Sequence, residues 1–262
     1  MDNFRADAYL KHIGAERPPT ADADALRTLH LLHQRAVPFE NLSIHLGQDI
    51  VLDEDALVAK IVDAGRGGFC YELNGAFTGL LRSLGYEVTM LSARVFTETG
   101  EIGPPYDHMA LRVDAADGSG PWLVDVGFGR HSDYPLRYDD RAEQQDPGGV
   151  FRIVETPDGD LDVLRDGAPQ YRLEQRPCEL RDFEATCWFQ RTYPTSHFRL
   201  SLVCSRLTED GRVTLSGRTL VTTEGERREE RELNEAEVLP AYREHFGITL
   251  DREPVVVAPP GA

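Results

Sequence analysis

The sequence contains very little lysine and no paired cysteine motif. Only Lys11 and Lys60 occur among 262 residues, so few amines could form a Schiff base, which disfavours a pyridoxal-type enzyme. The four cysteines show no CxxC spacing: Cys70, Cys178, Cys187 and Cys204. They are too sparse for a disulfide scaffold, which indicates reduced thiols.

Long apolar runs and an excess of positive charge are also missing. No run approaches the roughly 18–20 residues of a membrane-spanning helix, and residues 1–10 lack a basic region followed by an apolar one. We therefore expect a cytoplasmic protein without a membrane partner. The 28 basic and 45 acidic residues give a formal charge of −17, which argues against nucleic-acid binding through the overall field.

The common metal and nucleotide motifs do not occur either. HExxH and GxxxxGK[ST] are absent, and the dinucleotide-like patterns that start at Gly65 and Gly127 lack the third glycine. His30 and His33 stand three apart on an expected helix, but no further ligand completes a pattern. We interpret these histidines as part of a solvated helix face and expect no bound metal.

The composition that remains is that of a folded globular protein. Hydrophobic residues make up 40% and charged residues 28% of the chain, which is too apolar for a disordered protein. At 262 residues the chain could hold one large domain or two to three small ones.

Helical patterning dominates the first 85 residues. Apolar residues at helical spacing predict helices over 22–36 and 53–64, which Pro38 and Gly65 bring to an end. A third helix is expected from Cys70, with one apolar face that ends before Gly85.

From Glu87 onward the sequence favours strands. Runs over 88–96, 108–113 and 122–128 are separated by turn residues and predict an antiparallel meander. Further strands are expected at 151–154, 161–164 and 171–173, which favours a barrel or sandwich over βαβ units. Residues 139–149 are expected to form an exposed loop.

A third unit follows Tyr193-Pro194. The sequence predicts a β-hairpin around Asp210-Gly211 and a helix over 234–246 that closes at Gly247. The tail 255–262 is expected to be extended.

Cys70 is the first candidate for chemistry, because Gly67-Gly68 precede it and a helix begins at or just after it. Unpaired backbone N–H groups and the helix dipole at such a terminus lower the pKa of a thiol and can hold an oxyanion. The alternative interpretation of Cys70 is a buried, small apolar residue.

His108 and Asp125 are candidates for the base and its orienting group. If the loop between their strands pairs Val113 with Trp122, the two residues share one face as diagonal neighbours with backbones about 7–8 Å apart, close enough for imidazole and carboxylate to meet. A slip of one residue would separate them. A histidine at a strand start is often an ordinary surface group, but a carboxylate within the apolar run 123–126 requires a partner.

The motifs together resemble the arylamine N-acetyltransferases. The resemblance rests on Arg66-Gly67-Gly68-Phe69-Cys70-Tyr71-Glu72-Leu73-Asn74, on Asp107-His108 and on Val124-Asp125-Val126-Gly127-Phe128-Gly129. It extends to Val37-Pro38-Phe39-Glu40-Asn41 and Tyr193-Pro194-Thr195-Ser196-His197-Phe198, and so covers most of the chain.

The resemblance implies an α+β fold in agreement with these patterns. We expect an N-terminal helical bundle over 1–86 with the nucleophile, a central antiparallel β-barrel over 87–190 with His108 and Asp125, and a C-terminal α/β lid over 191–262. The Cys-His-Asp triad would lie at the domain junction.

The resemblance also implies a ping-pong reaction of xenobiotic metabolism. Cys70, activated by His108 that Asp125 orients, would take an acetyl group from acetyl-CoA and pass it to an arylamine, arylhydrazine or arylhydroxylamine. The implied substrate-binding residues are Phe39, Tyr71, Val95, Phe128 and Phe198, and those for CoA are Gly127, Phe128, Gly129 and Phe198. Acetyl-CoA would be a co-substrate with no permanently bound cofactor, and a homodimer is possible.

Two other readings share the triad. A cysteine hydrolase of papain or transglutaminase type uses the same three groups, and an ansamycin-type amide synthase shares the motifs but closes a macrolactam. The wider match favours amine transfer.

Two further expectations concern charge. We expect Glu40 and Arg66 to pair and fix the loop that presents Cys70. Since the formal charge of −17 opposes a polyanion, CoA would have to be held locally, by backbone N–H groups near Gly127, by nearby arginines and by apolar contacts.

Overall fold

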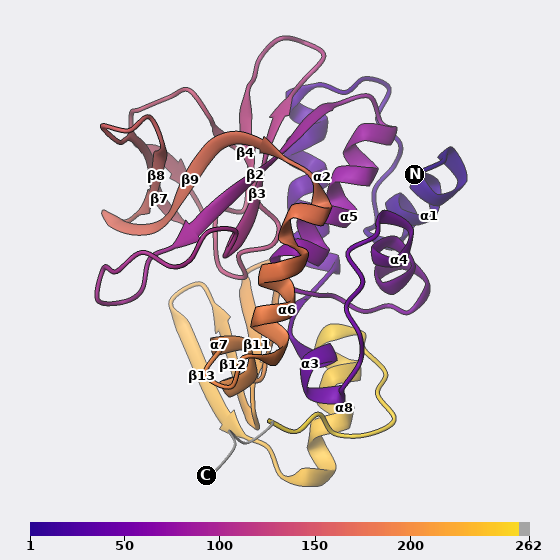
Figure 1. The fold of residues 1–262 in the computed structure, drawn as a ribbon. Coiled ribbons are helices and arrows are strands. Elements are labelled where there is room, and N and C mark those ends of the chain that lie inside the picture. The colour runs from indigo at the N-terminus through magenta and orange to yellow at the C-terminus, as the bar shows by residue number, and fades with distance from the viewer. Residues whose placement is uncertain (257–262) are drawn as a thin grey trace.

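The computed structural model describes residues 1–256, and in it a helical part and a β-barrel lie above a smaller sheet (Figure 1). The expected α+β class is confirmed. No helix of the described chain is both long and apolar enough to cross a membrane. Residues 257–262 of the expected extended tail lie outside the described residues.

The N-terminal helices follow the sequence pattern closely. Their bounds are α1 (Asn3–His12), α2 (Ala23–Ala36), α3 (Leu42–Leu46), α4 (Glu54–Val58), a continuing π-helical turn (Ala59–Asp63) and α5 (Cys70–Ser83). Asp22 caps α2 by accepting a hydrogen bond from the Ala25 N–H at 2.9 Å. Residues 70–81 of α5 are all buried, so this helix forms the centre of the largest hydrophobic cluster.

Eight antiparallel strands form the barrel in the order β5-β4-β3-β2-β9-β8-β7-β6. They are β2 (Glu87–Val95), β3 (His108–Asp114), β4 (Trp122–Val124), β5 (Leu136–Arg137), β6 (Gln144–Asp146), β7 (Gly149–Glu155), β8 (Leu161–Arg165) and β9 (Ala168–Cys178). The Gln144 side chain links the two edge strands, since it accepts from the Arg137 N–H at 2.7 Å and donates to the Arg137 carbonyl at 3.0 Å.

Two expectations about the barrel have different outcomes. The β3–β4 register is confirmed, because Val113 lies opposite Trp122 and Leu111 lies opposite Val124. The expected loop 139–149 is wrong in part, because Gln144–Asp146 pairs with β7 as a short strand. A three-residue strand of polar side chains has no apolar alternation that a sequence pattern could detect.

The C-terminal part begins with a 3₁₀ turn and ends with a helix on a sheet. Its elements are the 3₁₀ turn (Leu180–Phe183), α6 (Glu184–Thr192), α7 (His197–Leu200), β10 (Val203–Leu207), β11 (Gly211–Ser216), β12 (Thr219–Glu224), β13 (Arg227–Glu232) and α8 (Glu235–Phe246). The sheet takes its first strand, β1 (Phe39–Glu40), from the helical part, in the order β1-β10-β11-β12-β13. The loop before Cys70 is thereby attached to this sheet, because Phe39 also bridges to Gly68.

Candidate active site

Cys70 is the first residue of α5 and is presented by a loop in which glycine is required. A Cβ on Gly67 would lie 1.8 Å from the Pro38 carbonyl oxygen, and one on Gly68 would lie 2.6 Å from Glu72 side-chain atoms. The Glu72 carboxylate accepts from the Phe69 N–H at 3.2 Å and so caps the start of the helix. This packing fixes the thiol at the positive end of α5.

His108 and Asp125 form a buried pair beside this helix start. His108 Nε2 lies 2.7 Å from Asp125 Oδ2, and both side chains are almost fully buried. The β3–β4 register brings the two residues to one face, although Asp125 stands one position after β4. The backbone of Met109, directly after His108, lies near the Cys70 thiol, where it opposes part of the rise in the thiol pKa that burial causes. The structure therefore brings all three triad residues together.

Further hydrogen bonds hold Asp125 in place. Asn74 Nδ2, one turn after Cys70 on α5, donates to Asp125 Oδ1 at 2.9 Å, and the Gly127 N–H donates to the same oxygen at 3.0 Å. His30 Nε2 accepts from the Asp125 N–H at 3.3 Å. Burial would raise the pKa of Asp125, but the charge and hydrogen bond of His108 outweigh it, and the pKa lies well below its usual range.

The thiol of Cys70 experiences opposing influences. Burial raises the pKa of Cys70 well above its usual range, and the carboxylates of Asp107 and Asp125 add to this rise. The sequence predicted a lowered pKa from the helix N-terminus alone, and burial is the reason that this effect does not prevail. Formation of a thiolate at Cys70 would therefore require a base, and the imidazole of His108 is the candidate.

The loop after Asp125 packs directly on the nucleophile. A Cβ on Gly127 would lie 2.7 Å from the Cys70 Cα, so no larger residue fits at this position. Gly129 has a φ of +87°, and a Cβ there would lie 3.3 Å from the Phe39 ring. The expected CoA-binding turn 127–129 thus packs on the Cys70 backbone at one end and on the Phe39 ring at the other.

Aromatic side chains surround the triad on both sides. The Phe128 ring meets the His108 ring edge to face with centroids 5.1 Å apart, and the Phe198 ring lies 5.0 Å from Phe69. Phe39, Phe128 and Phe198 are all half-buried. These three rings come from different elements and lie near the candidate triad.

Two of the expected substrate residues have other surroundings. Tyr71 is fully buried, and its hydroxyl donates to the carbonyl oxygens of Tyr106 at 2.7 Å and Asp107 at 3.1 Å. Val95 is half-buried at the end of β2, opposite Tyr171 of β9. Their contact with substrate stays a prediction.

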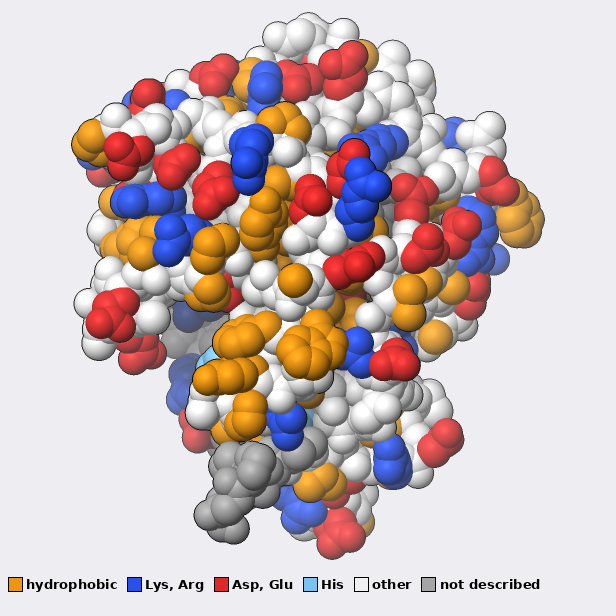
Figure 2. All heavy atoms as spheres, viewed as in Figure 1, with side chains coloured by type: hydrophobic (Ala, Val, Ile, Leu, Met, Phe, Trp, Pro, Cys, Tyr) orange, Lys and Arg blue, Asp and Glu red, His pale blue; other side chains and the backbone are white. Residues whose placement is uncertain are grey.

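Near the site, hydrophobic side chains gather on the surface over α6 and α7 (Figure 2). Trp188, Tyr193 and Leu200 are 65%, 49% and 46% exposed. The segment that carries Phe198 thus has an apolar outer face.

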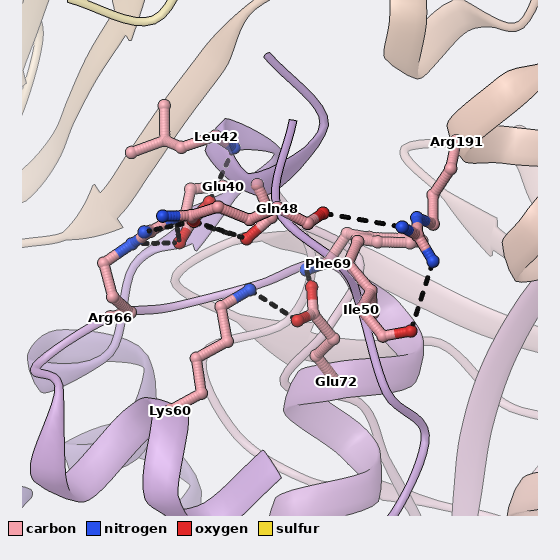
Figure 3. A network of polar contacts seen from close by, with 10 residues as sticks. Glu40, Leu42, Gln48, Ile50, Lys60, Arg66, Phe69, Glu72 and Arg191 are labelled. Atoms are coloured by element: carbon pink, nitrogen blue, oxygen red, sulfur yellow. Dashed lines mark hydrogen bonds and ion pairs between the residues drawn. The ribbon is translucent and has the colours of Figure 1, made fainter. Parts of the chain in front are cut away.

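A polar network connects the loop before Cys70 to segment 40–48 and to Lys60 (Figure 3). Arg66 Nη2 lies 2.8 Å from Glu40 Oε1, which is the pair expected from the sequence, and Arg66 Nη1 donates to Gln48 at 3.1 Å. Lys60 Nζ donates to Glu72 Oε1 at 2.5 Å. The buried capping carboxylate of Glu72 is therefore neutralised by one of the two lysines.

Sequence reasoning misjudged two histidines and overlooked one amide. His30 and His33 do not lie on a solvated face, because both are completely buried between α2 and its neighbours. His33 Nε2 lies 2.9 Å from the Tyr9 hydroxyl, and burial lowers the pKa of His33 to about 3. Asn74 is the last residue of the motif over 66–74. It stands four residues after Cys70, and residues four apart share one helix face, so this spacing indicated a position beside the triad.

Together these groups form a thiol, imidazole and carboxylate triad of the kind that forms covalent acyl intermediates. The described residues contain no group of three or more His, Cys, Asp or Glu side chains arranged to hold a metal ion. The class defined by the fold and site is a cysteine-dependent acyl-transfer enzyme.

Comparisons with known proteins identify the family within this class. A family model described as N-acetyltransferase matches residues 22–255. An arylamine N-acetyltransferase of Mycolicibacterium smegmatis is 36% identical and covers 92% of this chain and 91% of its own length. A Salmonella typhimurium relative, named arylamine N-acetyltransferase / N-hydroxyarylamine O-acetyltransferase, is 36% identical over 80% of this chain and 75% of its own.

Solved structures agree with this family. Arylamine N-acetyltransferase from Salmonella typhimurium has a TM-score of 0.88 at 30% identity and covers 96% of this chain and 94% of that chain. The Mycobacterium marinum enzyme in complex with CoA has a TM-score of 0.84 at 32% identity, with 93% and 92% covered. The chain belongs to the arylamine N-acetyltransferase family.

Proposed function

We propose that this protein transfers an acetyl group from acetyl-CoA to the nitrogen of an arylamine or arylhydrazine, or to an arylhydroxylamine, through a thioester on Cys70. The observation that carries the proposal is the buried His108–Asp125 pair at 2.7 Å next to the first residue of α5. The names of the relatives support the acceptor class, and the CoA complex of the Mycobacterium marinum relative supports the donor.

In the first half-reaction, Cys70 gives its proton to His108 and the thiolate attacks the acetyl carbonyl carbon. The backbone N–H groups at the start of α5 stabilise the oxyanion that forms. The carbon–sulfur bond to CoA breaks, the CoA sulfur takes the proton from His108, and acetyl-Cys70 remains. Asp125 stabilises the imidazolium throughout, because its pKa lies well below its usual range and it stays ionised.

In the second half-reaction, the acceptor amine attacks the thioester and His108 removes a proton from its nitrogen. The Cys70 sulfur leaves and is reprotonated, so each turnover restores the enzyme. The Phe39, Phe128 and Phe198 rings are the groups that would stack on an aromatic acceptor.

Two alternatives use the same triad. A hydrolase would pass the acetyl group to water, and an amide synthase would require an acyl chain and an amine within one substrate. Incubation with acetyl-CoA and a panel of arylamines separates the three, since only the transferase releases free CoA in proportion to added amine. Release of CoA at a rate independent of amine would support hydrolysis and overturn the proposal.

A further inference from the structure

The backbone that leads into His108 has an unusual conformation at Tyr106. The φ angle of Tyr106 is +59°, in the left-handed region that a bulky side chain rarely adopts, because its Cβ crowds the following carbonyl oxygen. Among the described non-glycine residues, only Asp166 shares a positive φ, and it stands in the turn between β8 and β9. Tyr106 instead precedes His108 by two residues.

Contacts from three different elements hold Tyr106 in this conformation. The Tyr71 hydroxyl of α5 donates to the carbonyl oxygens of Tyr106 at 2.7 Å and Asp107 at 3.1 Å. Ser92 Oγ of β2 accepts from the Tyr106 N–H at 3.2 Å, and Arg176 Nη2 of β9 donates to the Tyr106 hydroxyl at 3.1 Å. A strained backbone persists only where its surroundings determine it in this way, and such positions are concentrated at functional sites.

The side chain of Asp107 adds a fourth element to these anchors. Gln190 Nε2 of α6 donates to Asp107 Oδ1 at 2.7 Å, and Gln190 Oε1 accepts from the Ser196 hydroxyl at 2.6 Å. Gln190 and Ser196 are both buried. The entry to β3 is therefore fixed on the side of α6 as well.

Tyr71 connects this entry directly to the nucleophile, because it follows Cys70 on α5 and is fully buried. Its ring is packed 5.2 Å from the Phe69 ring and 5.5 Å from the Phe183 ring, between centroids. The pairing of β3 with β2 starts at His108, so the two carbonyl oxygens before it lie outside the strand ladder and need other donors. The Tyr71 hydroxyl supplies that donor.

We propose that the Tyr71 hydroxyl is a positioning group that fixes the imidazole of His108 relative to the Cys70 thiol. This inference rests on the proposed function. Without the hydroxyl, Tyr106 can leave its left-handed conformation, and the backbone that carries His108 then shifts relative to α5. A displaced imidazolium pairs less well with the Cys70 thiolate. The expected contact of Tyr71 with substrate is a separate prediction.

The test is Tyr71→Phe, which keeps the ring and removes only the hydroxyl. Alkylation of Cys70 by iodoacetamide across a pH range reports the thiolate without acetyl-CoA, and peptide mapping assigns the label to Cys70. The midpoint of this profile should rise by about one pH unit or more, because the thiolate loses its paired charge. The rate of Cys70 acetylation by acetyl-CoA at neutral pH should fall about tenfold or more.

Tyr86→Phe is the matched control. Tyr86 is also buried, and its hydroxyl donates to a backbone carbonyl oxygen, that of Asp22, at 2.9 Å. Both variants should lower the urea midpoint, because each loses a hydrogen bond of the same kind. Only Tyr71→Phe should shift the alkylation profile, so the pH readout separates positioning from a general structural role.

Ser92→Ala tests the same segment through an independent anchor. It removes the acceptor of the Tyr106 N–H and leaves the Tyr71 hydroxyl in place. The alkylation midpoint should rise by less than in Tyr71→Phe. This variant decides the question if Tyr71→Phe does not fold.

The possible results separate this inference from the proposed function. An unchanged alkylation profile in folded Tyr71→Phe, or in Ser92→Ala if the former does not fold, would overturn the inference, as would an equal shift in Tyr86→Phe. The proposed function would stand in these cases as long as the wild type acetylates arylamines. If the predicted shifts occur but the wild type transfers no acetyl group, the positioning of His108 stands and the proposed function fails.

Discussion

The carboxylate of Asp125 receives more hydrogen bonds than any other group of the triad. His108, Asn74 and the Gly127 N–H all donate to it. The sequence predicted its pairing with His108, because a carboxylate in an apolar run requires a partner. The spacing of Asn74 from Cys70 was a signal for its contact, whereas the contact of His30 could not be predicted, because it depends on how α2 packs against the barrel.

Asp125→Asn should keep the fold but slow acetylation of Cys70 by about 10²-fold or more. The amide has nearly the same shape, but it cannot stabilise an imidazolium and holds His108 in the wrong tautomer. Acetylation is measured by intact mass after mixing with acetyl-CoA. A folded variant with near-normal rate would remove Asp125 from the mechanism.

Asn74→Ala should destabilise the protein and slow acetylation together. Its amide donates to Asp125 and to the Met109 carbonyl oxygen, and it accepts from the Val126 N–H. Loss of such buried partners costs about 1–3 kcal/mol of unfolding free energy. Urea unfolding gives this value, and an unchanged midpoint would show that water replaces the amide.

At the scale of elements, the loop before α5 is fixed by contacts from distant parts of the chain. Helical periodicity predicted α2 and α5, and turn residues predicted the β10–β11 hairpin. The sequence patterns did not predict α1 or α6, and they did not predict the pairing of β1 with β10. A two-residue strand has no periodicity, and its partner lies more than 160 residues away, so only the folded chain brings them together.

Arg66→Ala should test how the loop is held. It leaves the fully buried Glu40 carboxylate without its closest cation, which costs about 3–5 kcal/mol. Arg181→Ala removes an exposed pair with Glu179 and should change the stability by less than about 1 kcal/mol. Thermal unfolding compares the two variants, and equal melting temperatures would show that the Arg66 pair does not stabilise the loop.

At the scale of the whole molecule, the fold keeps several histidines neutral inside an acidic protein. Burial lowers the pKa of His33 to about 3 and that of His131 to about 4, and it also lowers the pKa of His30. The sequence offered no sign of this burial, because a histidine on a helix next to polar residues has the same pattern when it faces solvent. The sequence shows the net charge and the family motifs directly, whereas the burial of these histidines depends on tertiary packing.

These histidines should make the protein less stable as the pH falls from about 6.5 to 4. In that range they bind protons in the unfolded chain but not in the folded one, so each lowers the unfolding free energy by up to about 1.4 kcal/mol per pH unit. Urea unfolding at several pH values measures the slope. His33→Gln should flatten it, whereas substitution of the exposed His197 should not; equal slopes would contradict the assignment.

The central claim is that the acetyl group passes through Cys70, and rapid mixing followed by intact-mass analysis tests it most directly. Mixing the enzyme with acetyl-CoA in the absence of amine should add one acetyl group, which peptide mapping places on Cys70. Adding an arylamine should then remove that group and yield one equivalent of acetylated amine, while a Cys187→Ser control behaves as the wild type. Acetyl transfer to the amine without acetylated Cys70, or an acetyl group on another residue, would contradict the account.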